Sequence, residues 1–388
     1  MNSPSVKLFF CGDFCSTPSA SRITVSEELK TLIRSADISV CNFEAPVKPE
    51  NYTLVQDPIF PRLYQSPDAA EFLESLGFDL LSFANNHVFD CGEEGYAETL
   101  KNFRRTVLVG SGTFEEAYRV KILECKGIKI GFLALTYAGF GVFDDALFRE
   151  GKGCAYINHL CVNHLIVDAK KKVDFLIILP HDGIEYIDIP LPETRARYKD
   201  FIDYGADIVV GCHPHCPQGW EIYKGKPIFY SLGNFFFNSK PTPDFKTPLP
   251  YWYNGMSVEI ELTSENQEIK FSIHHTLNKD NRYLTLDFSP EIKAHTDQLC
   301  RLLEKEELYR EALENEIKRH YCSKYIPILE YTFNTLSLKK GIKSFLKTIY
   351  REIFKKNRKN FKKWSFIVRS DTERNLMIRG IKKAHNYN

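Results

Sequence analysis

The stretch "LLSFANNHVFDCG", from Leu80 to Gly92, changes character abruptly, and this change decides the fold class. It begins as a short apolar run of the kind that forms a buried strand. The run ends at two asparagines and a histidine, Asn85 to His87, and Asp90 follows three residues later. A helical pattern then starts near Glu93. The stretch therefore predicts a strand, a polar loop and a helix, in which the loop is either a turn or one corner of a site.

The same order of strand, loop and helix recurs along the first two-thirds of the chain. Short apolar runs predict buried strands at 6–12, 38–44, 78–84, 107–112, 174–181 and 206–213. Amphipathic segments between them predict helices at 26–36, 66–77, 93–106, 158–173 and 193–205. Segments 119–136 and 219–237 have the pattern of hairpins with Lys-Gly turns, and strand character continues to about residue 278. This alternation predicts an α/β protein with a largely parallel sheet covered on both faces.

Polar side chains follow five of the predicted strands, at the carboxyl ends where open α/β sheets bind their ligands. They are Asp13, Asn42 with Glu44, Asn85 to His87 with Asp90, His181 with Asp182 and Glu185, and His213 with His215. A turn or a helix cap explains any one of these motifs, but not five of them in register with strand ends. Carboxylates, amides and imidazoles are ligands of Mn, Fe and Zn ions. We therefore predict a site for two divalent metal ions, with the candidate ligands Asp13, Glu44, Asn86, His181, His213 and His215.

Other polar residues near these strand ends have different predicted roles. His87 follows a candidate ligand, and we expect it to protonate a leaving group or to stabilise charge, with Asp90 holding its tautomer. The candidates for substrate binding are Asn85, Asp182, Glu185 and Asn234. The aromatic run Phe235–Phe237 is expected to pack in the core.

Several of these motifs together resemble the CapA family of capsule and poly-γ-glutamate synthesis proteins, a branch of the calcineurin-like metallophosphoesterases. The resemblance covers about residues 5–240 and rests on "GDF" at 12–14, "NFEAPV" at 42–47, "FANNHVFDCGEEGYAETL" at 83–100, "HDGIEY" at 181–186 and the long block 205–237. It implies a four-layer α/β/β/α metallophosphoesterase-like double sheet and a dinuclear metal site at the residues named above. It also implies a part in making or handling an anionic surface polymer.

The chain departs from the related sequences at three positions near the predicted ligands. Calcineurin-like enzymes have Asp-x-His where this chain has Asp13-Phe14-Cys15, so one metal position is expected to be weaker or differently filled. Asp182 stands where the family usually has tryptophan, and Cys212 where it usually has histidine before "HPH". Cys15 is the cysteine with the best claim to be a ligand, and the other cysteines near the motifs are expected to be buried thiols.

The bulk composition is that of an ordinary soluble protein. The chain has 388 residues, of which 43% are hydrophobic and 26% charged, and a net charge of +1. The first residues lack the pattern of a signal peptide, and no apolar run is long enough to cross a membrane. The 11 cysteines are scattered without a CxxC spacing. These features favour reduced thiols and a cytoplasmic location.

The chain changes texture from about residue 286, which we take as the boundary between a metallophosphoesterase-like domain at 1–285 and an α-helical extension at 286–388. Helical patterns occupy 291–322 and 337–364. Residues 339–388 contain 16 Lys and Arg against 3 Asp and Glu. This basic segment either packs on the main domain, lies on the inner face of an anionic membrane, or binds nucleic acid or another anionic polymer through charge alone, since no motif for specific nucleic-acid recognition is present. Co-sedimentation with anionic liposomes tests the membrane alternative, and equal pelleting of a form ending near Asn334 would reject it.

The predicted function is a metal-dependent hydrolase-like protein that acts in the synthesis of poly-γ-glutamate or another capsular polymer. Its substrate would be an anionic polymer or a phosphoester. The alternative is a non-catalytic role, as a structural or export component of a polymer-synthesis complex with the same fold.

Overall fold

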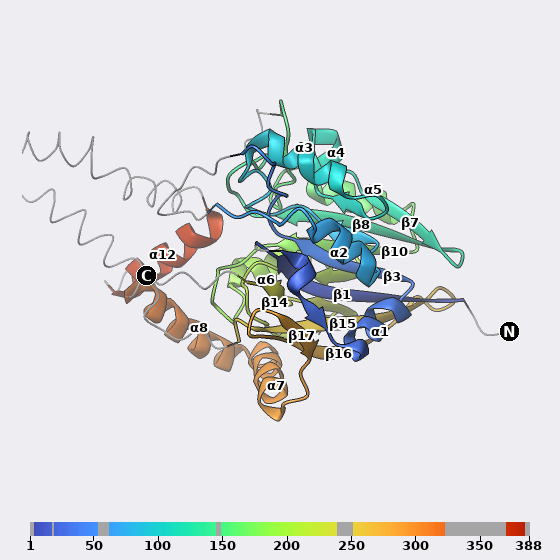
Figure 1. Cartoon of the computed structure of the whole chain (residues 1–388). Helices are drawn as coiled ribbons and strands as arrows, with labels where there is room; N and C mark the ends of the chain where they lie inside the picture. The colour runs from blue at the N-terminus through green and yellow to red at the C-terminus, as the bar shows by residue number, and fades with distance from the viewer. Residues whose placement is uncertain are drawn as a thin grey trace, which may run out of the picture.

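Two β-sheets packed face to face form the centre of the molecule, and helices cover the outer face of each sheet (Figure 1). The computed structural model describes residues 4–17, 19–52, 62–144, 149–238, 251–322 and 370–384. The arrangement of helix, sheet, sheet and helix confirms the predicted α/β class and its four layers. A helical C-terminal extension follows the last described strand, which ends at Leu286, as predicted.

The first sheet has nine strands in the order β2-β17-β16-β15-β1-β3-β4-β5, with β14 also paired to β1. Strands β1, β3, β4 and β5 are parallel, whereas β15, β16 and β17 extend the sheet from β1 by antiparallel pairing. The strands are β1 (Ser5–Cys15), β2 (Thr24–Val25), β3 (Ile38–Phe43), β4 (Leu80–Ser82), β5 (Val107–Val109), β14 (Asn234–Phe237), β15 (Asn254–Thr263), β16 (Glu268–Lys279) and β17 (Tyr283–Leu286).

The second sheet has six strands in the order β12-β13-β11-β10-β8-β7. The four central strands are parallel, and each edge strand joins by a hairpin. The two predicted Lys-Gly turns close these hairpins, with Lys126 and Lys224 both at positive φ. The strands are β7 (Lys121–Cys125), β8 (Ile128–Thr136), β10 (Phe175–His181), β11 (Ile208–Val210), β12 (Trp220–Tyr223) and β13 (Lys226–Phe229), and a separate small ladder pairs β6 (Ser111–Gly112) with β9 (Gly153–Cys154).

Helices begin and end at ordinary cap residues. Ser26 accepts a hydrogen bond from the backbone N–H of Leu29 at the start of α1, and Gly77 ends α2 in the left-handed conformation. The helices are η1 (Ala20–Arg22), α1 (Glu27–Ser35), α2 (Ala69–Leu76), α3 (Gly92–Asn102), α4 (Phe114–Ala117), α5 (Val162–Lys170), α6 (Pro192–Asp203), α7 (Pro290–Glu304), α8 (Glu306–His320) and α12 (Asp371–Ala384).

Three apolar clusters separate the four layers. On β1, Leu8 and Phe10 face the cluster between the two sheets, whereas Phe9 and Cys11 face the cluster beneath helices α1 and α2. The third cluster lies between the second sheet and helices α5 to α8. Side chains of a strand alternate between its faces, so a sheet that is apolar on both faces needs a layer on each side.

The chain crosses from the second sheet to the first between β13 and β14, inside the segment predicted as a single hairpin with its extension. At this crossing the backbone N–H of Asp13 donates to the carbonyl of Gly233, at 2.9 Å. A Cβ at Gly12 would lie 1.8 Å from that carbonyl oxygen, so only glycine permits the close approach. The contact places the end of β1 beside the end of β14.

The C-terminal extension packs on the second-sheet side. The predicted helical segment 291–322 forms two helices, α7 and α8, because Lys305 between them has an extended conformation. Residues 323–369, which include the predicted helix 337–364 and most of the basic charge, lie outside the described residues. Among the helices that the structure does describe, none combines the length and the apolar composition needed to cross a membrane.

Candidate metal centre

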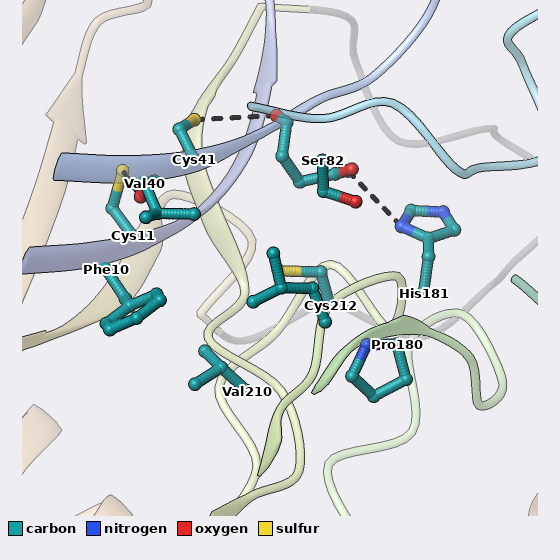
Figure 2. Close-up of a pocket in the computed structure, with 11 residues that line it drawn as sticks. Phe10, Cys11, Val40, Cys41, Ser82, Pro180, His181, Val210 and Cys212 are labelled. Atoms are coloured by element: carbon teal, nitrogen blue, oxygen red, sulfur yellow. Dashed lines mark hydrogen bonds between the residues drawn. The ribbon is translucent and has the colours of Figure 1, made fainter. Parts of the chain in front are cut away.

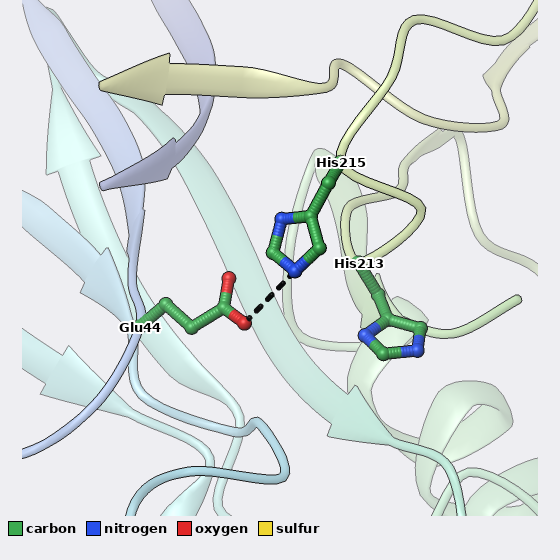
Figure 3. Close-up of side chains that lie close together, drawn as sticks. All are labelled: Glu44, His213 and His215. Carbon is green, nitrogen blue, oxygen red and sulfur yellow. Dashed lines mark ion pairs between the residues drawn. The ribbon is translucent and has the colours of Figure 1, made fainter. Parts of the chain in front are cut away.

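The candidate ligands come together at the carboxyl ends of strands from both sheets. Asp13 lies near the end of β1, Glu44 directly follows β3, and His181 is the last residue of β10. His213 and His215 lie in the loop after β11. Figure 3 shows the Glu44 carboxylate pointing toward His215, with His213 beside them. Side chains that are 200 residues apart in the sequence therefore meet in one place.

Two groups of three side chains have the spacing of metal ligands, and Glu44 belongs to both. One group is Asp13, Glu44 and His181, and the other is Glu44, His213 and His215. In each group the candidate ligand atoms lie within 4.8 Å of one another, and all these residues are buried. A carboxylate shared between two groups is the arrangement that bridges a pair of metal ions.

Among the residues that the structure describes, none donates a hydrogen bond to the carboxylate of Glu44. Both of its oxygens are buried without a partner, although Nε2 of His215 lies 3.5 Å from Oε1 and Nε2 of His181 lies 3.9 Å from it. Burial raises the pKa of Glu44 well above its usual value. Buried charged groups are normally paired or bound to metal. The residues present therefore fit a divalent cation.

His181 has the properties of a neutral imidazole ligand. Burial, followed by the nearby histidines, lowers its pKa well below the usual value. Its Nδ1 lies 3.2 Å from Nδ2 of Asn42, which also donates to Oδ1 of Asp13 at 2.7 Å. Because an amide N–H₂ can only donate, this contact makes Nδ1 the acceptor, so Nε2 carries the proton and donates to Oδ1 of Asn86, at 3.0 Å. A cation bound at Nε2 would take the place of this proton. Asn42 thus orients His181 from behind.

His215 is held in a similar way by Asn234. Nδ1 of His215 lies 2.9 Å from Oδ1 of Asn234, whose Nδ2 donates to the backbone carbonyls of His215 and Trp252. Burial alone would lower the pKa of His215, but the carboxylates of Glu44 and Asp13 raise it to about 10. A protonated His215 balances part of their negative charge. A divalent cation at the same place would supply that charge instead and favour the neutral imidazole.

His87 and Asp90 form a hydrogen-bonded pair next to this cluster. Nδ1 of His87 lies 2.7 Å from Oδ2 of Asp90, and its Nε2 lies 4.0 Å from Oε1 of Glu44. The side chain of His87 is 13% exposed, more than any of the candidate histidine ligands. Arg62 donates to Asp90 at 3.0 Å and fixes its position. The pair therefore lies between the buried cluster and the solvent.

The four predicted substrate-binding residues lie in different surroundings. Asn85 is buried and bonded to the Phe43 carbonyl and to the backbone N–H of His87, and Asn234 is behind His215. Asp182 accepts a hydrogen bond from Thr194 at 3.1 Å, and burial raises its pKa to about 6. Glu185 is half-buried and close enough to His215 and Glu44 to act on the pKa of both. Of the four, Glu185 has the surroundings best suited to binding a substrate.

Four residues around the centre have a left-handed backbone that is uncommon outside glycine. They are Ala45, Tyr186, His213 and His215, with φ values of 91°, 67°, 105° and 57°. Such conformations cost about 1–3 kcal/mol each, and they persist only where the surrounding structure enforces them. Their concentration here is typical of a functional site.

A small cavity next to the centre is lined by residues of both sheets, among them His181, Cys11, Cys41 and Cys212 (Figure 2). Burial raises the pKa of the Cys11 and Cys212 thiols well above the usual value, so these thiols stay protonated. Cys15 is also fully buried with a raised pKa, and its thiol points to the Tyr64 carbonyl, at 3.9 Å. Within the described residues, no cysteine belongs to either candidate ligand group.

Several residues that contribute to the centre were not among the predicted site residues. Asn42 and Arg62 orient a candidate ligand and the His87–Asp90 pair, and Tyr137 packs on His213 with 4.6 Å between ring centroids. Trp252 and Tyr186 pack around His215, with ring centroids 5.1 Å and 6.4 Å away. Asn42 was recognised as a polar residue at the same strand end as Glu44, but no role was assigned to it. Nothing local in the sequence identifies the other four.

Comparison with known proteins gives a consistent family. A family model described as bacterial capsule synthesis protein PGA_cap matches residues 7–239. The capsule biosynthesis protein CapA of Bacillus anthracis is 33% identical over 224 residues, which are 55% of this chain and 54% of that protein. The PGA biosynthesis protein CapA of Bacillus subtilis (strain 168) is 31% identical over 220 residues, 55% of this chain and 57% of that protein. The chain thus matches only a little over half the length of these curated relatives.

Solved structures with a related arrangement are more distant. A phosphatase of Mycoplasma pneumoniae is 16% identical, with a TM-score of 0.46, over 71% of this chain and 94% of that one. The calcineurin-like phosphoesterase YfkN of Bacillus subtilis is 14% identical, with a TM-score of 0.39, over 80% of this chain and 99% of that one. These similarities are too low to define the fold, which is established by the sheets and helices of this chain.

Proposed function

Because the chain belongs to the PGA_cap family of bacterial capsule synthesis proteins, we propose that it acts in the synthesis of poly-γ-glutamate or another anionic surface polymer, as a hydrolase that depends on two divalent metal ions. The substrate class would be a phosphoester or the polymer itself. The proposal draws on the family for the process and on the candidate metal centre for the chemistry.

The observation that carries the proposal is the Glu44 carboxylate. It is fully buried, has no hydrogen-bond donor among the residues that the structure describes, and is shared by the two candidate ligand groups. Its nearest cationic group is His215, at 3.5 Å, which balances only part of the negative charge of Glu44 and Asp13, and a carboxylate whose only task were structural would be given donors. A pair of cations is the simplest group that makes this arrangement favourable.

Each residue of the centre has a specific task in this proposal. Divalent ions, when bound, would polarise a water molecule and the oxygens of the scissile group. Asp13 and Glu44 supply the negative charge that holds the ions, and Asn86, His181, His213 and His215 supply neutral ligand atoms. His87 lies toward solvent with Asp90 on its Nδ1, so its Nε2 is placed to donate a proton to a leaving group.

A non-catalytic role in a polymer-synthesis complex is the second candidate function, and one observation favours it. The position two residues after Asp13 holds Cys15, whose buried thiol points to a backbone carbonyl and not into the candidate centre. The retained His87–Asp90 pair, at 2.7 Å, favours catalysis, because a purely structural descendant would not need it.

Metal content and turnover of a matched pair of variants test the proposal. Purified wild type is expected to contain about two equivalents of Mn, Fe or Zn by mass spectrometry and to hydrolyse a generic phosphoester. Glu44→Gln should lose the metal and the activity together, because the bridging charge is removed. Asp90→Asn should keep the metal and lose about 10²–10⁴-fold in turnover, because only the proton donor is misaligned. A wild type that holds metal without turnover would favour the non-catalytic role, and a protein that binds no metal would end the proposal.

A further inference from the structure

Helix α12 lies far outside the part of the chain that the family model matches, yet it packs into the core. Leu376 is fully buried, and Met377 is 9% exposed, in the apolar cluster that also contains Leu313 and Ile317 of α8. At Gly380 a Cβ would lie 2.4 Å from the ring of Tyr321, so the two segments approach closely. Figure 1 shows α12 beside α8, on the side of the molecule away from the N-terminus, which is where β1 ends. The helix is therefore docked at the end of the molecule that carries the candidate centre.

The first turn of α12 is tied to the segment that pairs with the end of β8. The hydroxyl of Tyr156 donates to Asp371, and Nδ2 of Asn158 lies 3.4 Å from the same carboxylate. Tyr156 forms a bridge with Thr136, and the backbone N–H of Ile157 donates to the Thr136 carbonyl at 2.8 Å. The helix thus braces the last residue of β8.

Tyr137, the residue after Thr136, contacts two candidate ligands. Its backbone N–H donates to the carbonyl of His181 at 3.2 Å, and its ring packs on His213 at 4.6 Å. Glu373, in the first turn of α12, is only 5% exposed, so this end of the helix is buried against the domain.

His213 depends on such support. Its φ of 105° is a strained conformation for a residue with a side chain, and strain of this kind is kept only by neighbouring contacts. The ring of Tyr137 is one of these contacts. A path of packed and hydrogen-bonded residues therefore connects α12 to His213.

We propose that α12 is part of the candidate metal centre, in which it holds Tyr137 against His213 and so positions one of the two ligand groups. Tyr137 and the first turn of α12 are positioning elements and not ligands. The inference rests on the proposed metal function. It predicts that loosening α12 weakens binding at the group Glu44, His213 and His215 more than at the group Asp13, Glu44 and His181, because the ring of Tyr137 packs on His213 whereas His181 is held within β10.

Two alanine substitutions on helix α12, made in the full-length chain, provide a matched test. Leu376→Ala removes a fully buried side chain that docks α12, whereas Ile378→Ala removes one that is 41% exposed. Metal-free protein is titrated with Co²⁺, with calorimetry for the affinities and the visible spectrum for the ligand geometry. Leu376→Ala should weaken one of the two binding steps by about 10-fold or more and change its spectrum, since residues that orient ligands typically contribute 10–100-fold to metal affinity. Ile378→Ala should match wild type in both steps.

A loss of general stability would look different, because it would not select one binding step. If Leu376→Ala does not fold, Tyr156→Phe removes only the hydroxyl that bonds to Asp371 and should weaken the same step to a lesser extent. Tyr137→Leu should reproduce the selective loss. Titrations in which the variants leave both steps unchanged, or weaken both equally, would overturn the proposal. A wild type that takes up no Co²⁺ would instead overturn the proposed function, and this inference with it.

Discussion

Glu74 and Glu44 are both buried glutamates, but they differ in the hydrogen bonds that their carboxylates accept. Glu74, on α2, is 8% exposed, and its Oε1 accepts hydrogen bonds from the backbone N–H groups of Arg104, Arg105 and Thr106 at 2.7–3.0 Å. Glu44 is fully buried and accepts no hydrogen bond from any described residue. Burial opposes ionisation of both, but the three backbone donors outweigh it at Glu74 and lower its pKa, whereas the pKa of Glu44 is raised.

The difference separates a structural carboxylate from one that is kept for a ligand. Two other carboxylates resemble Glu74, since the buried Asp207 pairs with Lys170 and Lys226 at 2.7 Å, and the half-buried Glu221 pairs with Arg195 at 3.0 Å. Folding normally supplies hydrogen-bond donors or close cations to buried charges, because a charge without them is costly. Glu44 departs from this pattern, since its nearest cationic group is a histidine at 3.5 Å.

The largest expected effect on stability is that of removing Glu74. Glu74→Ala leaves three backbone N–H groups without their acceptor, and we expect a loss of about 3 kcal/mol in the free energy of unfolding. Urea-induced unfolding of the metal-free protein measures it. The control is Glu71→Ala, an exposed position on the same helix, which should stay within about 0.5 kcal/mol of wild type. Equal losses at both positions would mean that the hydrogen bonds of Glu74 contribute little.

The same measurement at Glu44 should give the opposite sign. In the presence of a chelator, Glu44→Gln removes a buried charge that has no donor, so the free energy of unfolding should stay the same or rise by about 1 kcal/mol. With metal added, the order should reverse, since only wild type gains binding energy. A clear destabilisation of metal-free Glu44→Gln would show that the carboxylate is structural.

The smallest expected effect is the change with pH in the stability that Glu74 contributes. Because the folded-state pKa of Glu74 lies below its unfolded value of about 4.3, its stabilisation is fully present above that pH and is lost as the pH falls through the folded value. The difference in stability between wild type and Glu74→Ala should therefore be constant from pH 7 to about 5 and narrow below about 4.3. Unfolding curves recorded at a series of pH values check this, and a gap that widened in acid would contradict the hydrogen-bonding account.

Most of the strands and helices were predictable because their signals are local. The apolar run at 174–181 became β10, and the segment 66–77 contains α2, which ends at Gly77. The chain's return from the second sheet to the first at β14 was not predicted, because an aromatic strand such as Phe235–Phe237 does not specify which sheet it joins. The break at Lys305 was missed for a related reason, since nothing but tertiary packing separates α7 from α8.

The candidate centre was predictable only where a ligand-type residue follows a strand. Asp13, Glu44, His181 and His215 do so, and the structure brings them into common reach of one another. Tyr137 and Trp252 also follow or precede strand residues, but an aromatic side chain carries no sign of what it packs on. Asn234 satisfied the pattern of a residue at the mouth of the site, yet its amide is bonded to His215 and to backbone carbonyls. Positioning residues are thus the part of a site that a sequence conceals.

The candidate ligands come from both sheets, so the centre would affect how firmly the two sheets are held together. Asp13 and Glu44 belong to one sheet, and His181, His213 and His215 follow strands of the other, while the interior between the sheets is apolar. Apolar faces resist separation but oppose sliding only weakly, since dispersion contacts have no direction. A divalent cation bound by ligands from both sheets would cross-link them. The resistance of the two sheets to sliding would then depend on the metal occupancy of the centre.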